Sequence, residues 1–431
     1  MTSKITTYDY MKNFQCTGAD CPDSCCSVGW QIGYDKKHYL VLKELMSQQP
    51  DTKKIFDENL SLNHSADNKF ATIRNLDNGR CSFLQDNQLC HLHSQYGTHC
   101  LSNTCAQYPR LLLQLDSKIE MHGILSCPEV TRLYLSRDNA SEELAISLDG
   151  LPRGDDFHIA NNVSTVQGYY YLHFPLVKNL MLEIADNTHH DLDLKLYLLA
   201  SFSDRLAPLY FRGCKELSAE AIQSEYHQQV EDQTITRLHG LLQKYAAPEP
   251  FAIMLIQAIL LFRHKHSQDD NFGKLVSSVL GSYDSEIADS AKVNNDIAIF
   301  EPHDLWLAYR KRHDKIYNKL GEKIDSYLLK YLTNCIRREW FINLPEPFLY
   351  IQMLITRMAM LKFMFISDPK TLALLDSENA QQALEQLAIE HIYSFTRAID
   401  QDVGFLKSIY QVMDEQRYFD IEYTPMFITM H

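Results

Sequence analysis

Residues 16–30, CTGADCPDSCCSVGW, place four cysteines within eleven positions. The chain has eleven cysteines among its 431 residues, and nine of these lie in the first 127 residues. The N-terminal sequence has no apolar run of the length that a signal peptide requires, so we expect the protein to stay in the cytoplasm. Crowded thiols in a reducing compartment indicate a metal site and argue against a disulfide framework.

The composition is that of a soluble globular protein, with 45% hydrophobic and 22% charged residues. The formal net charge of −14 argues against binding to nucleic acid phosphates, and no polybasic tract indicates a membrane surface. The two most apolar stretches, 251–262 and 347–365, are shorter than a membrane span or carry charged residues. We therefore expect buried helices there, no nucleic acid partner and no membrane.

The first part of the chain, residues 1–140, is predicted to be a cysteine-rich metal-binding module with short β-hairpins. Residues 110–125 alternate around an Asp116-Ser117 turn, which predicts a hairpin, and residues 80–85 look like a short strand. Residues 127–136 predict a helix entered through Pro128, because proline suits the first helical position. The polar, turn-rich stretch that follows places the domain boundary near residue 140.

The second part, residues 141–431, is predicted to be a larger α-helical domain on which the module packs. Apolar residues recur at spacings of three and four over 169–186, 192–211 and 380–399. No glycine-rich nucleotide motif and no strand–helix alternation is present. The predicted fold class is therefore mainly α.

The thiols come from separate segments that must converge if they are to bind one metal. Cys21 and Cys25 would share a face if a helix began at Pro22. Cys81 and Cys90 flank a stretch that can fold back on itself, and two further cysteines bracket the predicted hairpin. Spacing alone leaves tetrahedral zinc and an iron–sulfur cluster open. His91, His93 and His99 could complete a zinc site or be exposed loop residues, and three thiols are expected to be ordinary cysteines: Cys100, Cys214 and Cys335.

Three blocks of sequence resemble a known family. NFQCTGADCPDSCCSVGWQIGYD (13–35), CSFLQDNQLCHLHSQYG with CAQYPR (81–110) and LSCPEVTRLYL (125–135) are similar to the flagellin lysine-N-methylase (FliB) family. Part of the pattern also resembles the wider cysteine-cluster family described as zinc- or iron-chelating. The resemblance is weaker in the helical body, where it covers residues 331–348.

The resemblance implies a protein-lysine N-methyltransferase that transfers a methyl group from S-adenosyl-L-methionine to lysine ε-amines of flagellin. It also implies a four-iron–four-sulfur (4Fe-4S) cluster. By position, eight cysteines match the family's pattern, of which the sequence does not select four: Cys25, Cys26, Cys81, Cys90, Cys105, Cys127, Cys21 and Cys16.

The chemistry of the donor suggests which residues could bind it. A sulfonium cation is attracted to aromatic ring faces, which makes Trp30, Tyr108 and the tyrosine run 169–171 candidates. Arg110 could bind the donor's carboxylate, and Glu129 could accept a proton or hold a hydrogen bond. The alternative for the aromatic residues is a place in the core, and the alternative for Arg110 and Glu129 is a solvated or paired surface charge. No catalytic base is indicated.

Two other functions are compatible with the same features. The chain could be a non-catalytic protein-binding module stabilised by zinc or by an iron–sulfur cluster. It could also be a redox protein that uses the cluster for electron transfer. The sequence does not indicate an oligomeric state.

Overall fold

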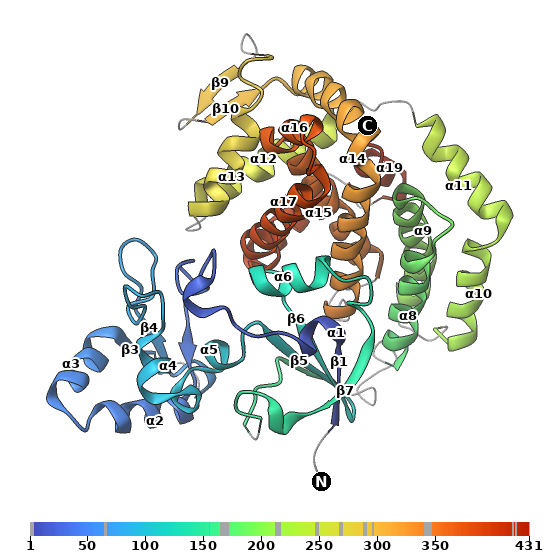
Figure 1. The fold of residues 1–431 in the computed structure, drawn as a ribbon. Coiled ribbons are helices and arrows are strands. Elements are labelled where there is room, and N and C mark those ends of the chain that lie inside the picture. The colour runs from blue at the N-terminus through green and yellow to red at the C-terminus, as the bar shows by residue number, and fades with distance from the viewer. Residues whose placement is uncertain are drawn as a thin grey trace. The chain divides into compact units, whose positions relative to one another are not determined.

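The computed structural model describes residues 4–63, 67–154, 156–163, 172–211, 217–245, 250–266, 270–287, 291–294, 297–339, 347–415, 418 and 420–430. The chain forms two compact units, which we call the cysteine-rich unit (Met1–Asn162 with Gln268–Asp270) and the helical unit (Val163–Ser267 and Asn271–His431). Helices dominate the described residues (Figure 1), which confirms the mainly α class.

A five-stranded sheet in the order β7-β1-β6-β5-β8 forms one half of the cysteine-rich unit. Its strands are β1 (Lys4–Tyr8), β5 (Arg110–Leu115), β6 (Lys118–Gly123), β7 (Glu143–Ser147) and β8 (Asn161–Val163). The first strand runs parallel to β6 and antiparallel to β7, with Lys4 opposite Ser147 and Tyr8 opposite Glu143. This pairing places residues 143–147 in the cysteine-rich unit, whereas the sequence placed the boundary near residue 140.

The predicted hairpin at 110–125 is confirmed as β5 and β6, which pair from Arg110↔Gly123 to Leu115↔Lys118. Asp116 occupies the turn with a φ of 52°, a left-handed conformation that aspartate tolerates better than most residues. Two short helices belong to the same half, α1 (Asp9–Lys12) and α6 (Pro128–Leu135). The second confirms the helix expected after Cys127.

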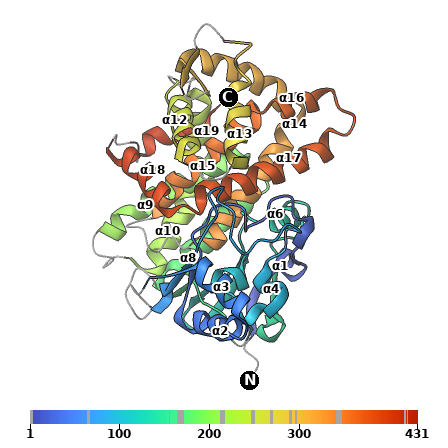
Figure 2. The ribbon, with the colours of Figure 1, turned by 90° about the vertical axis from the view of Figure 1, so that its left-hand side faces the viewer.

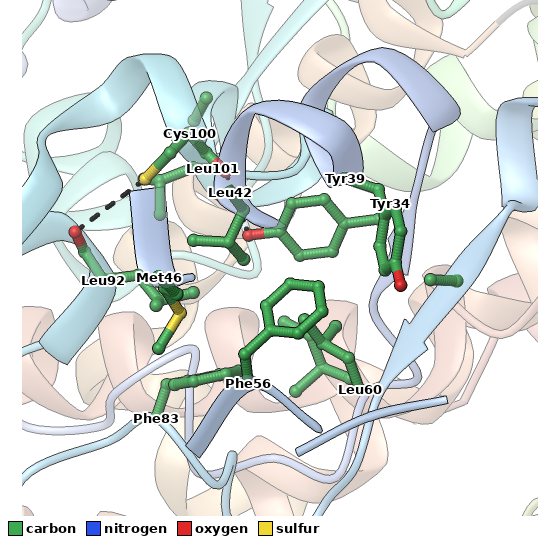
Figure 3. Packing of buried hydrophobic residues seen from close by; sticks show 13 residues of the cluster. Tyr34, Tyr39, Leu42, Met46, Phe56, Leu60, Phe83, Leu92, Cys100 and Leu101 are labelled. Atoms are coloured by element: carbon green, nitrogen blue, oxygen red, sulfur yellow. Dashed lines mark hydrogen bonds between the residues drawn. The ribbon is translucent and has the colours of Figure 1, made fainter. Parts of the chain in front are cut away.

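The other half of this unit contains a three-stranded sheet in the order β2-β4-β3. The strands are β2 (Gly33–Tyr34), β3 (Leu60–Leu62) and β4 (Ala71–Ile73), and the helices are α2 (Lys36–Met46), α3 (Pro50–Asn59), α4 (His91–Tyr96) and α5 (Asn103–Gln107). Their apolar faces bury one hydrophobic cluster, drawn in Figure 3, which includes Tyr34, Leu42, Met46, Phe56 and Leu92.

Cys100 belongs to this cluster. It is fully buried, and its thiol points to the carbonyl oxygens of Gly97 and Leu92, as Figure 3 shows for Leu92. Cys335 is also buried, so both lie in one of the two environments expected for ordinary cysteines, buried or on the surface, while Cys214 lies outside the described residues.

The strand expected at residues 80–85 is wrong. Cys81 and Leu84 each form an isolated bridge, to Asn75 and to Cys90. The N–H of Leu84 bonds the carbonyl of Cys81 at 3.0 Å, so the segment closes into a turn. A tight turn competes with an extended strand for the same backbone groups.

The helical unit contains twelve α-helices longer than four residues among its described residues, together with the β9–β10 hairpin (Ala291–Asn294, Ile297–Phe300). They are α8 (Phe174–Asp186), α9 (Leu192–Phe211), α10 (Ala219–Gln229), α11 (Asp232–Lys244), α12 (Phe251–His266), α13 (Asp270–Gly281), α14 (Pro302–Arg338), α15 (Pro347–Ser367), α16 (Pro369–Ala373), α17 (Ala380–Phe395), α18 (Val403–Glu415) and, at the end, the five-residue α19 (Thr424–Ile428). A π-helical turn, η9 (Thr396–Asp400), follows α17.

Helix α15 is the core of the helical unit. It contacts α9, α14, α17 and α19, which surround it in Figure 2. All of its residues are buried, although its length and apolar composition would suffice to cross a membrane. Burial on all sides explains why the sequence is apolar around the whole helix, and it confirms the expected buried helix.

Candidate metal centre

Cys16, Cys21, Cys25 and Cys26 lie on the irregular segment between α1 and β2. The helix expected to start at Pro22 is wrong, because the described helical turn is η1 (Gly18–Asp20) and residues 21–26 form bends and turns. The Ser24 side chain accepts the N–H of Cys26 at 3.2 Å, and the Ser24 carbonyl accepts the N–H of Ser27. Such local serine bonds compete with a helix.

Cys81 and Cys90 are brought together as expected, by a chain reversal between them. The N–H of Gln85 bonds the carbonyl of Leu89 at 3.0 Å, and Leu84 bridges Cys90. The N–H of Cys81 bonds the carbonyl of Cys26 at 2.8 Å, which joins this turn to the first segment. Burial raises the pKa of both thiols, while backbone hydrogen bonds to each sulfur act in the opposite direction.

Cys105 lies in the first turn of α5, whose N-cap is Ser102. The Ser102 hydroxyl accepts the N–H of Cys105 at 3.1 Å and also bonds its thiol. Although the residue as a whole is exposed, desolvation of the sulfur raises the pKa of Cys105 to about 12. The charges of Cys90, Cys25 and Cys81 add to this rise.

Cys127 is the N-cap of α6, and its sulfur has backbone hydrogen bonds with Glu129 and Val130. Backbone N–H groups at a helix N-terminus favour a thiolate over a thiol. Burial nevertheless raises the pKa of Cys127 to about 12, and the charges of Cys21 and Cys25 contribute. A cation bound at these sulfurs would remove this repulsion, because it binds the deprotonated form.

The spacing of the sulfurs bears on the kind of metal. None of the ten described cysteines is in a disulfide. Tetrahedral zinc, with Zn–S distances near ~2.3 Å, requires sulfurs about 3.8 Å apart. In the described ranges, the single group of three possible ligand atoms within 4.8 Å of one another is Cys335, Glu339 and Asp400, in the helical unit. No three of the described N-terminal sulfurs lie that close to one another, so this part of the described chain contains no preformed site of zinc size.

The histidines near these cysteines do not complete a compact site. His93 and His99 are exposed, as expected for loop residues. The buried Nε2 of His91 has no hydrogen-bond partner, and its ring contacts Tyr96.

The residues predicted to bind the donor are partly brought together. The rings of Trp30 and Tyr108 meet edge to face with centroids 5.2 Å apart, and the Tyr108 hydroxyl lies 2.9 Å from Ser126 Oγ. The Arg110 guanidinium lies over the Phe14 ring at 4.9 Å. Burial lowers the pKa of Arg110, and the charges of Cys16 and Cys127 oppose this, so Arg110 lies near the thiols. The tyrosine run 169–171 lies outside the described residues.

Glu129 is held by a different partner. Its carboxylate accepts two hydrogen bonds from Arg132, at 2.8 and 2.7 Å, one helical turn further along α6. The guanidinium thereby pairs with both oxygens of the carboxylate and neutralises its charge.

The sequence reasoning missed a pocket of about 610 Å³ in the cysteine-rich unit, lined by residues that include Lys36, Asn68, Asn103 and His158. At its edge His38 is buried between two carboxylates: Nδ1 lies 2.7 Å from Asp35 and Nε2 lies 3.0 Å from Asp156. The N-cap pattern Asp35-x-x-His38 was a usable local signal. No such local signal indicated Asp156, because it lies 118 residues from His38 in the sequence.

A buried group of charges in the helical unit was also missed. The guanidinium of Arg357 bonds both oxygens of Glu339 and lies 3.2 Å from Asp400, while Arg338 bonds Glu339 at 2.8 Å. Cys335 completes the group within reach of the two acids. Two guanidinium cations already neutralise these carboxylates, so the group is not suited to a metal ion.

Comparison with known proteins places the chain in a family. Residues 178–426 match the family model for the FliB lysine N-methylase C-terminal domain. Over 137 residues, 32% of this chain, it is 30% identical to the flagellar biosynthetic protein FliU of Salmonella muenchen, of which the match covers 79%. It is 29% identical over the same length to the lysine-N-methylases of Salmonella typhimurium and Salmonella choleraesuis.

The match spans only 33% of the length of each lysine-N-methylase, and no solved structure matches the chain. The enzyme class in the family's name, lysine N-methylase, is the predicted one. Since the family model covers more than half of the 431 residues, the chain belongs to the FliB lysine N-methylase family, as the resemblance of its cysteine blocks predicted.

Proposed function

We propose that this protein transfers methyl groups from S-adenosyl-L-methionine to lysine ε-amines of flagellin. The match of residues 178–426 to the FliB lysine N-methylase domain carries the proposal. The relatives named as lysine-N-methylases and as a flagellar biosynthetic protein support the enzyme class and a flagellar substrate.

The reaction is a polar displacement. The lysine nitrogen forms a bond to the methyl carbon while the bond from that carbon to the sulfonium sulfur breaks, and the amine proton is lost. Because an unperturbed lysine has a pKa near ~10.4, the site must desolvate the ammonium or offer a base. Trp30 and Tyr108 would place ring faces and edges near the sulfonium, and Arg110 would bind the donor's carboxylate.

The N-terminal thiols would hold an iron–sulfur cluster, as the resemblance of the cysteine blocks to the family implies. When bound, such a cluster ties together the segments that contribute its thiolates. These segments also carry Trp30, Tyr108 and Arg110, so the thiols would fix the geometry of the donor site. Attack by a nitrogen nucleophile requires no electron transfer, which favours this structural role.

We also propose that the protein acts in the cytoplasm, where unmethylated flagellin is made and thiols stay reduced. The most apolar helix supports this location, since α15 is buried in the helical unit and is not available to a bilayer.

The experiment is a methyl-transfer assay with anaerobically purified protein, unmethylated flagellin and isotopically labelled donor. We expect labelled methyl-lysine in flagellin, detected by mass spectrometry of its peptides. Calorimetric titration of the same preparation with the donor serves as the companion measurement. Flagellin binding without donor binding or methyl transfer, in protein with intact metal, would contradict the enzyme and support a non-catalytic binding module.

A further inference from the structure

The proposed function leaves the pocket beside His38 without a role. Its volume is about 610 Å³, and its lining residues belong to the cysteine-rich unit. We propose that this pocket binds the side chain of the lysine that is to be methylated, with the carboxylate of Asp156 receiving its ammonium group. The inference rests on the proposed function and deepens it, because it gives the acceptor lysine a binding site in addition to that of the donor.

A lysine of the chain itself already occupies the proposed ammonium position. The Nζ atom of Lys37 lies 2.6 Å from Oδ2 of Asp156. The side chains of Lys37 and Asp156 are 65% and 41% exposed, and exposed ion pairs of this kind contribute little to stability. A lysine from another protein can therefore displace Lys37 and make the same contact.

The carboxylate that would receive the ammonium is held by buried groups. The Nε2 atom of His38 lies 3.0 Å from Oδ2 of Asp156, and its Nδ1 atom lies 2.7 Å from Asp35. Burial of the imidazole between two acids fixes its orientation. Because each carboxylate bonds a different ring nitrogen, the two acids do not converge on one point, as they would around a metal ion.

The segment around Asp156 is also fixed to α5. Arg153 donates hydrogen bonds to the carbonyl of Asp156 at 3.2 and 3.0 Å and to the side chain of Asn103 at 2.6 Å. Gln107 exchanges two hydrogen bonds with the backbone of His158, at 3.4 and 3.0 Å. These bonds place the carboxylate before any ligand arrives, and such preorganisation lowers the entropic cost of binding.

The geometry at Asp156 favours an ammonium over a guanidinium. Lys37 and His38 both contact the same oxygen, Oδ2. A compact ammonium can share one oxygen with a second donor, whereas a guanidinium prefers to bond both oxygens of a carboxylate in parallel. The site is therefore suited to lysine. Asp156 binds the ammonium form, and the loss of its proton before methyl transfer is a separate step.

The rest of the lining suits the aliphatic stem of a lysine. Leu40 is 49% exposed, and Phe157 lines the same pocket. Their apolar surface can cover the methylene groups that separate the ammonium from the backbone. The amide of Asn68, which also lines the pocket, offers a donor and an acceptor to the peptide next to the lysine. The volume of about 610 Å³ is ample for such a ligand.

Calorimetric titration of the anaerobically purified full-length protein with Nα-acetyl-lysine-N-methylamide tests the inference. Asp156→Asn should weaken binding of this probe about tenfold, because the substitution removes the charge and keeps the shape of the side chain. Lys37→Met should bind the probe about threefold more tightly than the wild type, because the internal competitor is removed. The norleucine analogue, which lacks the ammonium, should not bind.

Lys53→Met is the matched control. Lys53 forms an exposed ion pair with Asp57 on α3 and does not line the pocket. Its replacement should leave the affinity for the lysine probe unchanged, which separates the loss of the internal competitor from the loss of any surface lysine.

Wild-type affinity in Asp156→Asn would overturn the inference, as would absence of probe binding in both the wild type and Lys37→Met. If Asp156→Asn fails to fold, Lys37→Met decides instead, because Lys37 is largely exposed: tighter binding supports the inference, and unchanged or weaker binding overturns it. Methyl transfer by Asp156→Asn with the wild-type KM for flagellin would remove this site and leave the proposed function intact. A wild type that binds the lysine probe but transfers no methyl group would instead remove the proposed function and leave the lysine-binding site.

Discussion

The guanidinium of Arg357 donates two parallel hydrogen bonds to the carboxylate of Glu339, at 2.9 and 2.8 Å. Arg357 lies on α15, the central helix of the helical unit, and Glu339 is the C-cap of α14, the longest helix. The ion pair therefore links these two helices. Asp400 joins through a 3.2 Å contact with Arg357 and accepts hydrogen bonds from Tyr331 at 3.0 and 2.9 Å. The π-helical turn η9 thereby becomes the third element of the network.

Replacing Arg357 by methionine should destabilise the helical unit by about 3–5 kcal/mol, because buried Asp400 loses its cationic partner and Glu339 keeps only Arg338. The free energy of unfolding in denaturant measures this loss. Lys370→Met is the matched control, since Lys370 and Glu390 form an exposed ion pair, worth under ~1 kcal/mol. A loss for Arg357→Met as small as that of the control would show that the network is not stabilising.

Protonation of Glu339 should account for part of the stability that the protein loses in acid. Burial alone would raise its pKa, but the charges of Arg357 and Arg338 lower the pKa of Glu339 to about 2. The stability that it contributes is therefore present above the unfolded pKa, near ~4.3, and is lost as the pH falls toward 2. Glu339→Gln should be less stable than the wild type at pH 7 and should lose less stability between pH ~5 and ~2. Equal slopes for the two proteins would refute the assignment.

Short-range patterns in the sequence were sufficient for local structure. The hairpin at β5–β6 followed from alternation around Asp116, and α6 followed from Pro128 after Cys127. The buried α15 followed from its apolar composition. In each case the determinants lie within one turn or one element, so the neighbouring residues already contain the information.

Contacts between distant residues were not predictable in the same way. Arg357 was visible as a charge in an apolar helix, but its partners lie 18 and 43 residues away in sequence, at Glu339 and Asp400. The turns at residues 21–26 were missed because the side chain of Ser24 competes for backbone N–H groups. Which thiols share a metal depends on how the two sheets place them, and spacing along the chain does not record this.

His38 should stabilise the contact between the start of α2 and the segment around Asp156. His38→Gln keeps a polar side chain but cannot bond Asp35 and Asp156 at once, so we expect a loss of about 1–3 kcal/mol. Hydrogen bonds from Lys37 and His38 lower the pKa of Asp156, and bonds from His38 lower the pKa of Asp35 against its burial. The stability that these two carboxylates contribute is present above pH ~4 and is lost as the pH falls further and they become protonated.

Thermal unfolding of His38→Gln at pH 7 and pH 3.5 measures both effects. The difference between variant and wild type should shrink at the lower pH. His93→Gln is the control, because His93 is exposed on α4. A difference that stays constant between the two pH values would contradict the charge-assisted contact.

Removal of the proposed cluster should loosen the cysteine-rich unit selectively. Without a cation, burial and mutual repulsion raise the pKa of Cys81, Cys90 and Cys105, so the thiols become protonated and no longer hold their segments together. Hydrogen exchange in protein treated with an iron chelator should accelerate at residues 71–127. Exchange in α15 should stay slow, because its burial depends on helix packing within the helical unit. Equal acceleration in both regions would contradict a local role for the metal.

Trp30 should contribute to donor binding through its ring. Its contact with Tyr108 fixes the orientation of both aromatics, and an aromatic face near a sulfonium is worth about 1–2 kcal/mol when it is desolvated. Trp30→Ala should therefore weaken binding of S-adenosyl-L-methionine about tenfold in calorimetric titration. Iron content must be measured in parallel, because Trp30 lies only four residues after Cys26.

Glu129→Gln is the matched comparison: Glu129 is engaged by Arg132, so donor affinity should change little. Unchanged affinity in Trp30→Ala, or a larger loss in Glu129→Gln, would move the donor site away from the Trp30–Tyr108 pair and toward the pocket beside His38.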